Sequence, residues 1–122
     1  MMTMEPKKKR LKSTPTLRQK KRYLFFRVIV DGEWKPDFLN IRGAIWNSLE
    51  SWLGEGSLAK ADVRIINNLW DGRKQVGVLV CGPKYVDQVK VALGLVHQIG
   101  DQRAIVQVVR VSGTIKSGKT KL

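Results

Sequence analysis

The chain has 122 residues, of which 23 are Lys or Arg and 10 are Asp or Glu, giving a formal net charge of +13. This length fits one domain with its own core, and no apolar run approaches the roughly 20 residues that a membrane span needs. One His and one Cys exclude an internal disulfide and a four-ligand zinc site, so we expect a cytoplasmic protein that itself binds no metal or cofactor.

The positive charge is concentrated at the two ends of the chain. Residues 1–22 carry nine basic residues and one Glu, residues 23–112 have a net charge of +2, and residues 113–122 add three Lys. Such ends favour a polyanionic partner, and RNA or DNA is favoured over a membrane because the ends lack anchoring aromatic residues. A basic tail that only aids solubility is the alternative interpretation.

The composition of the N-terminus also predicts the domain organisation. Like-charged segments with Pro, Ser and Thr cannot bury enough apolar surface to fold. We therefore expect a disordered basic arm at residues 1–15, a single domain at 16–116 and a basic tail at 117–122.

The domain begins with a predicted strand followed by a predicted helix. Residues 22–30 are rich in β-branched and aromatic side chains and are closed by Asp-Gly at 31–32, which predicts a strand. Pro-Asp at 36–37 predicts the start of a helix that runs to about residue 53 and ends at Gly54. Apolar residues at helical spacing predict one buried stripe: Phe38, Ile41, Ile45, Leu49 and Trp52.

Two further strands are predicted to form a hairpin. Residues 60–69 alternate between apolar and polar, Asp-Gly at 71–72 is a strong turn signal, and residues 73–81 form the returning strand. The alternation in this returning strand predicts that Val76, Val78 and Val80 point toward the core.

A second helix and a last strand complete the predicted order. Pro83 suits a first helical position, and apolar residues spaced along the next 13 positions predict one buried face. Gly-Asp at 100–101 predicts a turn into a strand over residues 103–111. The order β-α-β-β-α-β predicts an α+β fold of the ferredoxin-like, split βαβ type, with a four-stranded antiparallel sheet and both helices on one face.

The sheet face without helices is the first candidate binding surface. The predicted alternation places seven residues there: Tyr23, Phe25, Arg27, Arg64, Gln75, Leu79 and Gln107. Aromatic, Arg and Gln side chains suit stacking on unpaired RNA bases, with Tyr23 and Arg27 as candidates, or covering by a protein. The RNA-recognition motif shares this topology but also carries aromatic residues on its third strand, where this chain has none. Packing of Phe25 under a terminal extension or a partner is therefore an equal alternative.

The topology also predicts that the two basic ends meet. The first and last strands are antiparallel neighbours in this fold, so the start of one lies near the end of the other. We expect one RNA-facing edge at which backbone amides and hydroxyls approach phosphate. Its candidate residues are Arg18, Lys20, Lys21, Arg22, Ser112, Gly113, Thr114, Lys116 and Lys119.

The motifs that could support catalysis are weak. Residues 113–120 fit the P-loop pattern, but only two residues follow, too few for the helix that such a loop requires. His97 has no nucleophile pattern around it, the acidic residues show no repeated spacing, and Cys81 ends an apolar strand. The chain does not look like a catalyst by itself.

Two of the four Trp residues are candidates for contacts with a protein partner. Trp46 lies at the margin of the apolar helical stripe, and Trp70 lies in the predicted hairpin. A position for Trp46 in the core is an equal alternative.

Three segments together resemble one known family. They are residues 16–24 (TLRQKKRYL), residues 45–61, which contain Ile-Trp, Leu-Gly and Ala-Lys-Ala, and residues 111–116 (VSGTIK). Over residues 16–116 the chain is similar to the small protein subunit of ribonuclease P, called protein component 2 in archaea and shared with the eukaryotic enzyme. The last segment is the most specific and argues against the P-loop interpretation. The chain stops soon after Lys116 without a long acidic tail like those of eukaryotic members, so we expect an archaeal-type protein.

The resemblance implies the split βαβ fold and a non-catalytic role in a ribonucleoprotein. Members of the family support a catalytic RNA that acts as an endonuclease. This RNA, with its bound magnesium, hydrolyses a phosphodiester bond and so removes the 5′ leader from precursor tRNA. The resemblance implies three partners: ribonuclease P RNA, precursor tRNA and a TIM-barrel protein subunit, with two such protein pairs able to join through the small subunit. The alternative is a ferredoxin-like protein-interaction module with basic arms in another ribonucleoprotein.

Overall fold

A computed structural model describes residues 20–115 of the chain. The predicted arm at residues 1–15 and tail at 117–122 lie outside the described residues. The elements in chain order are β2 (Arg22–Val30), α1 (Phe38–Ala61), β3 (Arg64–Ile65), η2 (Asn67–Leu69), β4 (Val76–Cys81), η3 (Pro83–Tyr85), α2 (Val86–Gly94), β5 (Gln98–Ile99) and β6 (Gln102–Ser112).

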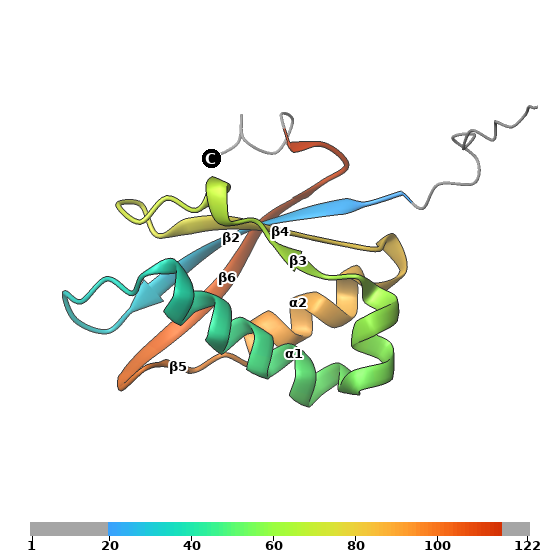
Figure 1. The fold of residues 1–122 in the computed structure, drawn as a ribbon. Helices are drawn as coiled ribbons and strands as arrows, with labels where there is room; N and C mark the ends of the chain where they lie inside the picture. The colour runs from blue at the N-terminus through green and yellow to red at the C-terminus, as the bar shows by residue number, and fades with distance from the viewer. Residues whose placement is uncertain (1–19, 116–122) are drawn as a thin grey trace, which may run out of the picture.

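The strands form an antiparallel sheet with both helices on one side (Figure 1). The strand order is β3-β4-β2-β6-β5, so the long strands β2 and β6 are neighbours, as predicted. The α+β class is confirmed, but the described sheet has five strands rather than four. The additional strand, β5, pairs only Gln98 and Ile99 with the start of β6 around a turn at Gly100. Two residues are too few to show an alternating pattern.

Helix α1 continues beyond the predicted end at Gly54. This glycine interrupts the helix with φ 77° and ψ 167°, and a further helical segment runs to Ala61, followed by Asp62 in the left-handed conformation. Leu58 and Ala61 on this segment are buried in the core. The predicted strand at residues 60–69 is correspondingly reduced to Arg64–Ile65.

The hydrophobic core lies between the helices and the facing side of the sheet. Ile41, Ile45 and Leu49 of the predicted stripe are fully buried. Trp52 departs from the prediction, because its side chain is exposed and donates a hydrogen bond to Gln88 Oε1 at 3.2 Å. The described residues contain no helix long and apolar enough to cross a membrane.

The orientation predicted for the third long strand, β4, is wrong. Phe25 pairs with Val78 and Phe26 pairs with Gly77, so paired residues place Val76, Val78 and Val80 on the face away from the helices. The residues that point to the core are Gly77, Leu79 and Cys81. Leu79 is therefore a core residue rather than part of the open face.

The hairpin loop explains this reversal. Gln75 adopts the left-handed conformation with φ 55° and belongs to the loop, so the strand begins only at Val76. Gln75 is buried in that loop rather than placed on the open face. Because Val76–Cys81 is almost equally apolar in both alternating sets, the alternation could not distinguish its faces.

Gly77 permits a close packing arrangement beside the core. A Cβ atom at this position would lie 2.8 Å from both Phe26 Cζ and Trp70 Cε3. The rings of Phe26 and Trp70 stack with centroids 6.3 Å apart and an interplanar angle of 26°. Trp70 is thus half-buried against the core.

Candidate nucleic-acid interface

All charged residues in the described strands are arginines: Arg22, Arg27, Arg64, Arg103 and Arg110. The acidic residues within 20–115 all lie in helices, loops and turns. Register places four of the arginines on the sheet face away from the helices, which we call the open face. Three of them lie opposite residues that face away from the helices: Arg27 opposite Val76, Arg64 opposite Val80, and Arg110 opposite Phe25. The fourth, Arg103, comes directly before Ala104, which points to the core, so Arg103 points the other way.

The arginines of the open face are only weakly engaged within the protein. Among residues 20–115, the one ion pair joins Arg64 Nε and Asp62 Oδ1 at 3.7 Å, with both side chains largely exposed. Water screens such a pair strongly, so it contributes little to stability. Arg27 and Arg103 are exposed and have no carboxylate partner in the described part of the chain. Their guanidinium groups can accommodate phosphate oxygens.

A β-bulge adds one arginine to this face. The register between β2 and β6 shifts between Phe25 and Phe26, so Phe26 pairs with Val108 and Phe25 with Arg110. Without the bulge, the side chain of Arg110 would point toward the helices, as those of Ala104 and Val108 do. The sequence alone gives no indication of this shift, which is why Arg110 was not among the predicted site residues.

The open face is divided into a buried half and an exposed half. Phe25 is fully buried and Val78 is 3% exposed. Ile29 and Ile105, which pair across β2 and β6, are 48% and 59% exposed. Phe25 therefore packs within the protein and offers no ring for base stacking, whereas the exposed half is accessible to a partner.

The described parts of the two basic ends meet at one end of the central strands. Tyr23 pairs with Ser112, and a Cβ atom on Gly113 would lie 3.8 Å from Arg22 Nη1. Lys20 and Lys21 precede this point and Thr114 follows it, with its amide donating to Ser112 Oγ at 3.2 Å. The predicted convergence is confirmed for these residues. It lies at the strand ends rather than along a lateral edge, because β2 is a central strand.

The remaining candidates at these ends are Arg18, Lys116 and Lys119, which lie outside the described residues. Most of the P-loop-like segment at 113–120 also lies outside them. The RNA-binding roles of this group stay predictions.

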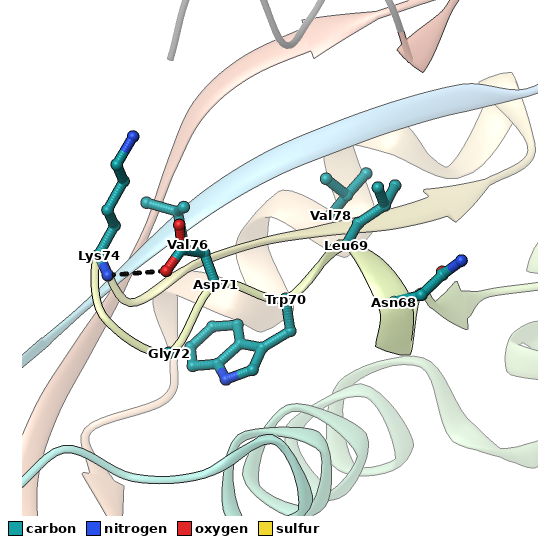
Figure 2. A pocket seen from close by; sticks show the side chains of 8 residues that line it. All are labelled: Asn68, Leu69, Trp70, Asp71, Gly72, Lys74, Val76 and Val78. Atoms are coloured by element: carbon teal, nitrogen blue, oxygen red, sulfur yellow. Dashed lines mark hydrogen bonds between the residues drawn. The ribbon is translucent and has the colours of Figure 1, made fainter.

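A hollow of about 490 Å³ lies beside the β4 hairpin on the open face. Figure 2 shows that Leu69, Val76 and Val78 point to the same side as Lys74, whereas the ring of Trp70 points the other way, toward α1. Trp70 thus contributes to the helix-facing layer. Its predicted role in a partner contact remains untested.

The second candidate for a partner contact, Trp46, lies on the outer surface of α1. Its side chain is 36% exposed and lines a hollow of about 380 Å³ between α1 and residues 63–67, with Leu39 on one side and Arg64 on the other. An exposed aromatic ring beside an exposed Leu39 is typical of a protein contact.

The described side chains that could act as a nucleophile or a general base include Cys81 and His97. Burial raises the pKa of the Cys81 thiol to about 11, so the thiol stays protonated and weakly nucleophilic at neutral pH. His97 is exposed, with Nδ1 3.3 Å from Leu95 O. Within residues 20–115, no three His, Cys, Asp or Glu side chains lie close enough together to hold a metal ion.

The comparisons of sequence with known proteins agree on one family, and the comparison of structures shows a shared fold. Residues 22–122 match the model described as the Rpp14/Pop5 family. The chain is 42% identical over 107 residues to ribonuclease P protein component 2 of Pyrococcus furiosus, with 88% of this chain and 86% of the relative covered. The same-named protein of Archaeoglobus fulgidus is 36% identical, with 88% and 92% covered. A chain in the cryo-EM structure of yeast ribonuclease MRP shares the fold with a TM-score of 0.62 at 10% identity, covering 80% of this chain and 76% of that chain.

Proposed function

The chain belongs to the Rpp14/Pop5 family, and on this premise we propose that it is an RNA-binding protein subunit of ribonuclease P. In this role it supports a catalytic RNA that removes 5′ leaders from precursor tRNA. The observation that carries the proposal is the open face, where every strand charge is an arginine and none is a carboxylate.

This charge arrangement suits RNA more than a small ligand. Each arginine can donate two parallel hydrogen bonds to a phosphate and release a bound counterion from the RNA. Arg27 and Arg103 lie on neighbouring strands of a broad surface rather than in an enclosed cavity. At the strand ends, the exposed Lys21 and Gly113 extend this surface toward the basic termini, whereas Ser112 beside them is buried.

The chain contributes positive charge and shape, and the RNA with its magnesium ions carries out the hydrolysis. The protonated state of the Cys81 thiol is consistent with this division, since it leaves no thiolate there to act as a nucleophile. The fold that presents these residues is ferredoxin-like, with β5 as an addition at the edge of the sheet beside β6.

The proposed protein partner is a TIM-barrel subunit, and two such pairs join through this chain. The hollow around Trp46 and Leu39 is the candidate contact, because it lies between α1 and the β3 edge of the sheet and carries an exposed indole. Arg64 belongs both to this hollow and to the open face, so the protein and the RNA would bind to adjoining surfaces.

A second candidate function is a protein-interaction module whose basic ends aid assembly. The exposed Ile29 and Ile105 on the open face favour it, because exposed aliphatic pairs are typical of surfaces that a protein covers. The two functions differ in salt dependence. RNA binding weakens steeply with added salt, whereas apolar protein contacts change little.

The proposal is tested by reconstituting precursor tRNA cleavage from the cognate RNA and the TIM-barrel subunit, with and without this chain. We expect the chain to raise the cleavage rate and lower the magnesium concentration that is required. The double variant Arg27→Gln/Arg103→Gln should lose much of this effect. The matched variant Lys84→Gln/Lys90→Gln, on the helix side, should retain it. If adding the chain changes neither the rate nor the magnesium requirement, the proposal is wrong.

A further inference from the structure

A groove lies at the end of the sheet opposite the convergent basic ends. It has a volume of about 550 Å³ and lies between residues 28–35 and the β4 hairpin loop. Three cations line it, Lys35, Arg73 and Lys74, against one carboxylate, Glu33. The strand β2 separates this groove from Tyr23, and its nine residues span roughly 30 Å at about 3.3 Å per residue.

The loop that carries two of these cations is held in place by its own hydrogen bonds. Asp71 Oδ1 accepts from the backbone amides of Arg73 at 2.9 Å and Lys74 at 3.1 Å. The Gln75 side chain donates to Gly72 O at 2.8 Å and to Pro36 O at 3.2 Å, which joins the loop to the other wall of the groove. A loop whose backbone is already ordered loses little backbone entropy when its side chains bind a ligand.

The third cation is also tied to this loop. Lys35 Nζ donates to Arg73 O at 3.2 Å, so the ammonium group is held across the groove from its own segment. The Asp71 carboxylate is directed toward the loop amides rather than paired with a lysine or arginine side chain. The three positive charges therefore gather around one opening.

An exposed aromatic ring completes the groove. Trp34 is 41% exposed, and its ring lies over the turn between β5 and β6. Its Cη2 atom would be 3.3 Å from a Cβ atom on Gly100, where the chain has φ 60°. One part of the ring is thus fixed against the turn while the remainder is open to solvent. A fixed, exposed indole is a suitable surface for stacking a base.

We propose that this groove is a second binding site for single-stranded RNA, in which Lys35, Arg73 and Lys74 neutralise neighbouring phosphates and Trp34 stacks on a base. The inference rests on the proposed RNA-binding function and extends it. The RNA contact would run along the length of the open face, with Arg27 between the two ends.

The test measures binding of a fluorescently labelled eight-nucleotide oligouridine to the full chain at several salt concentrations. We expect Trp34→Ala to weaken binding about tenfold because a stacked base is lost, and Trp34→Phe to restore most of the affinity. Trp52→Ala removes an exposed indole from the helix side and should leave the affinity unchanged.

The cations are tested with two triple variants of equal charge. Replacing Lys35, Arg73 and Lys74 with Ala should lower the slope of log affinity against log salt by about 2, at ~0.7 per phosphate contact on a single strand. Replacing the exposed Lys60, Lys84 and Lys90 on the helices should lower it by less than half as much.

The four indole N–H signals in a ¹H–¹⁵N NMR spectrum locate the site independently of any variant that folds poorly. Oligouridine should shift the Trp34 signal and leave the Trp52 signal in place. An unmoved Trp34 signal, or unchanged affinity in Trp34→Ala, overturns the inference. So does a Trp34→Ala variant that binds the oligonucleotide normally but loses the TIM-barrel subunit, since the groove would then be a protein contact. If Trp34→Ala binds the oligonucleotide normally and also supports normal precursor tRNA cleavage, the second site is wrong but the proposed function is unaffected.

Discussion

The two faces of the sheet are built from the same strands but differ in what they carry. The helix-facing side is lined with apolar residues such as Leu24, Phe26 and Leu79, which are buried. The open face holds four arginines and, over half of its length, exposed aliphatic side chains. The first face determines stability, and the second is available for binding. Substitutions on the two faces should therefore separate these properties.

The largest expected effect lies on the helix-facing side. Leu49→Ala should lower the free energy of unfolding by about 2–5 kcal/mol because it leaves a cavity in the core. Leu39→Ala makes the same chemical change on the same helix at a residue that is 71% exposed, and should change stability by less than ~0.5 kcal/mol. Urea unfolding measures both. Equal losses would show that α1 does not pack as described.

A smaller loss is expected at the point where β4 touches the core. Gly77→Ala would place a Cβ atom 2.8 Å from Phe26 Cζ and from Trp70 Cε3, and such overpacking costs about 1–3 kcal/mol. Gly43→Ala in α1 has no atom within 4 Å of the new Cβ and should stabilise the protein by roughly 0.5–1 kcal/mol. If Gly77→Ala proved as stable as wild type, the orientation of β4 would be in doubt.

On the open face we expect an effect on binding and almost none on folding. Arg27→Gln/Arg103→Gln should reduce the salt slope for structured RNA by about 1.8, at ~0.9 per duplex phosphate contact. Its unfolding midpoint in urea should match that of wild type, because both side chains are exposed and outside the described ion pair. Lys84→Gln/Lys90→Gln provides the control for charge alone. An unchanged slope in the arginine variant would remove the open face from the RNA contact.

The smallest effect is expected from the hairpin loop at acid pH. Hydrogen bonds from the Lys74 and Arg73 amides hold the pKa of Asp71 below its ordinary value of 3.8. A carboxyl group with a lowered pKa stabilises the folded state above the unfolded-state pKa, and this contribution is lost as the pH falls through the folded-state pKa. Wild type should therefore lose loop protection in amide hydrogen exchange below about pH 3.8, whereas Asp71→Asn should show no such step. If Asp71→Asn lost the same protection over the same pH range, the loss would have to come from the titration of another group.

The sequence predicted the long elements well because each has its own periodicity and turn residues. Strand β2 has the predicted bounds, and Ile41, Ile45 and Leu49 form the predicted buried stripe. The errors lie where local patterns are ambiguous. Gly54 interrupts α1 without ending it, and β4 is apolar in both alternating sets.

The candidate site was predictable only in part, because it depends on register. Strand pairing that follows from the topology brought Tyr23 and Ser112 together, as predicted. The contribution of Arg110 depends on a β-bulge, and that of Arg73 and Lys74 on a loop that folds toward Pro36. Such contacts between distant segments leave no periodic trace in the sequence.

The most direct test of the central claim is a map of ultraviolet crosslinks between the full chain and its ribonuclease P RNA, read by mass spectrometry. We expect crosslinked peptides from the open face and the strand ends, including Tyr23, Arg27 and Gly113. Peptides from the outer surfaces of α1 and α2 should remain free of RNA. Crosslinks confined to those helices, with none in β2 or β6, would contradict the assignment of the open face to RNA.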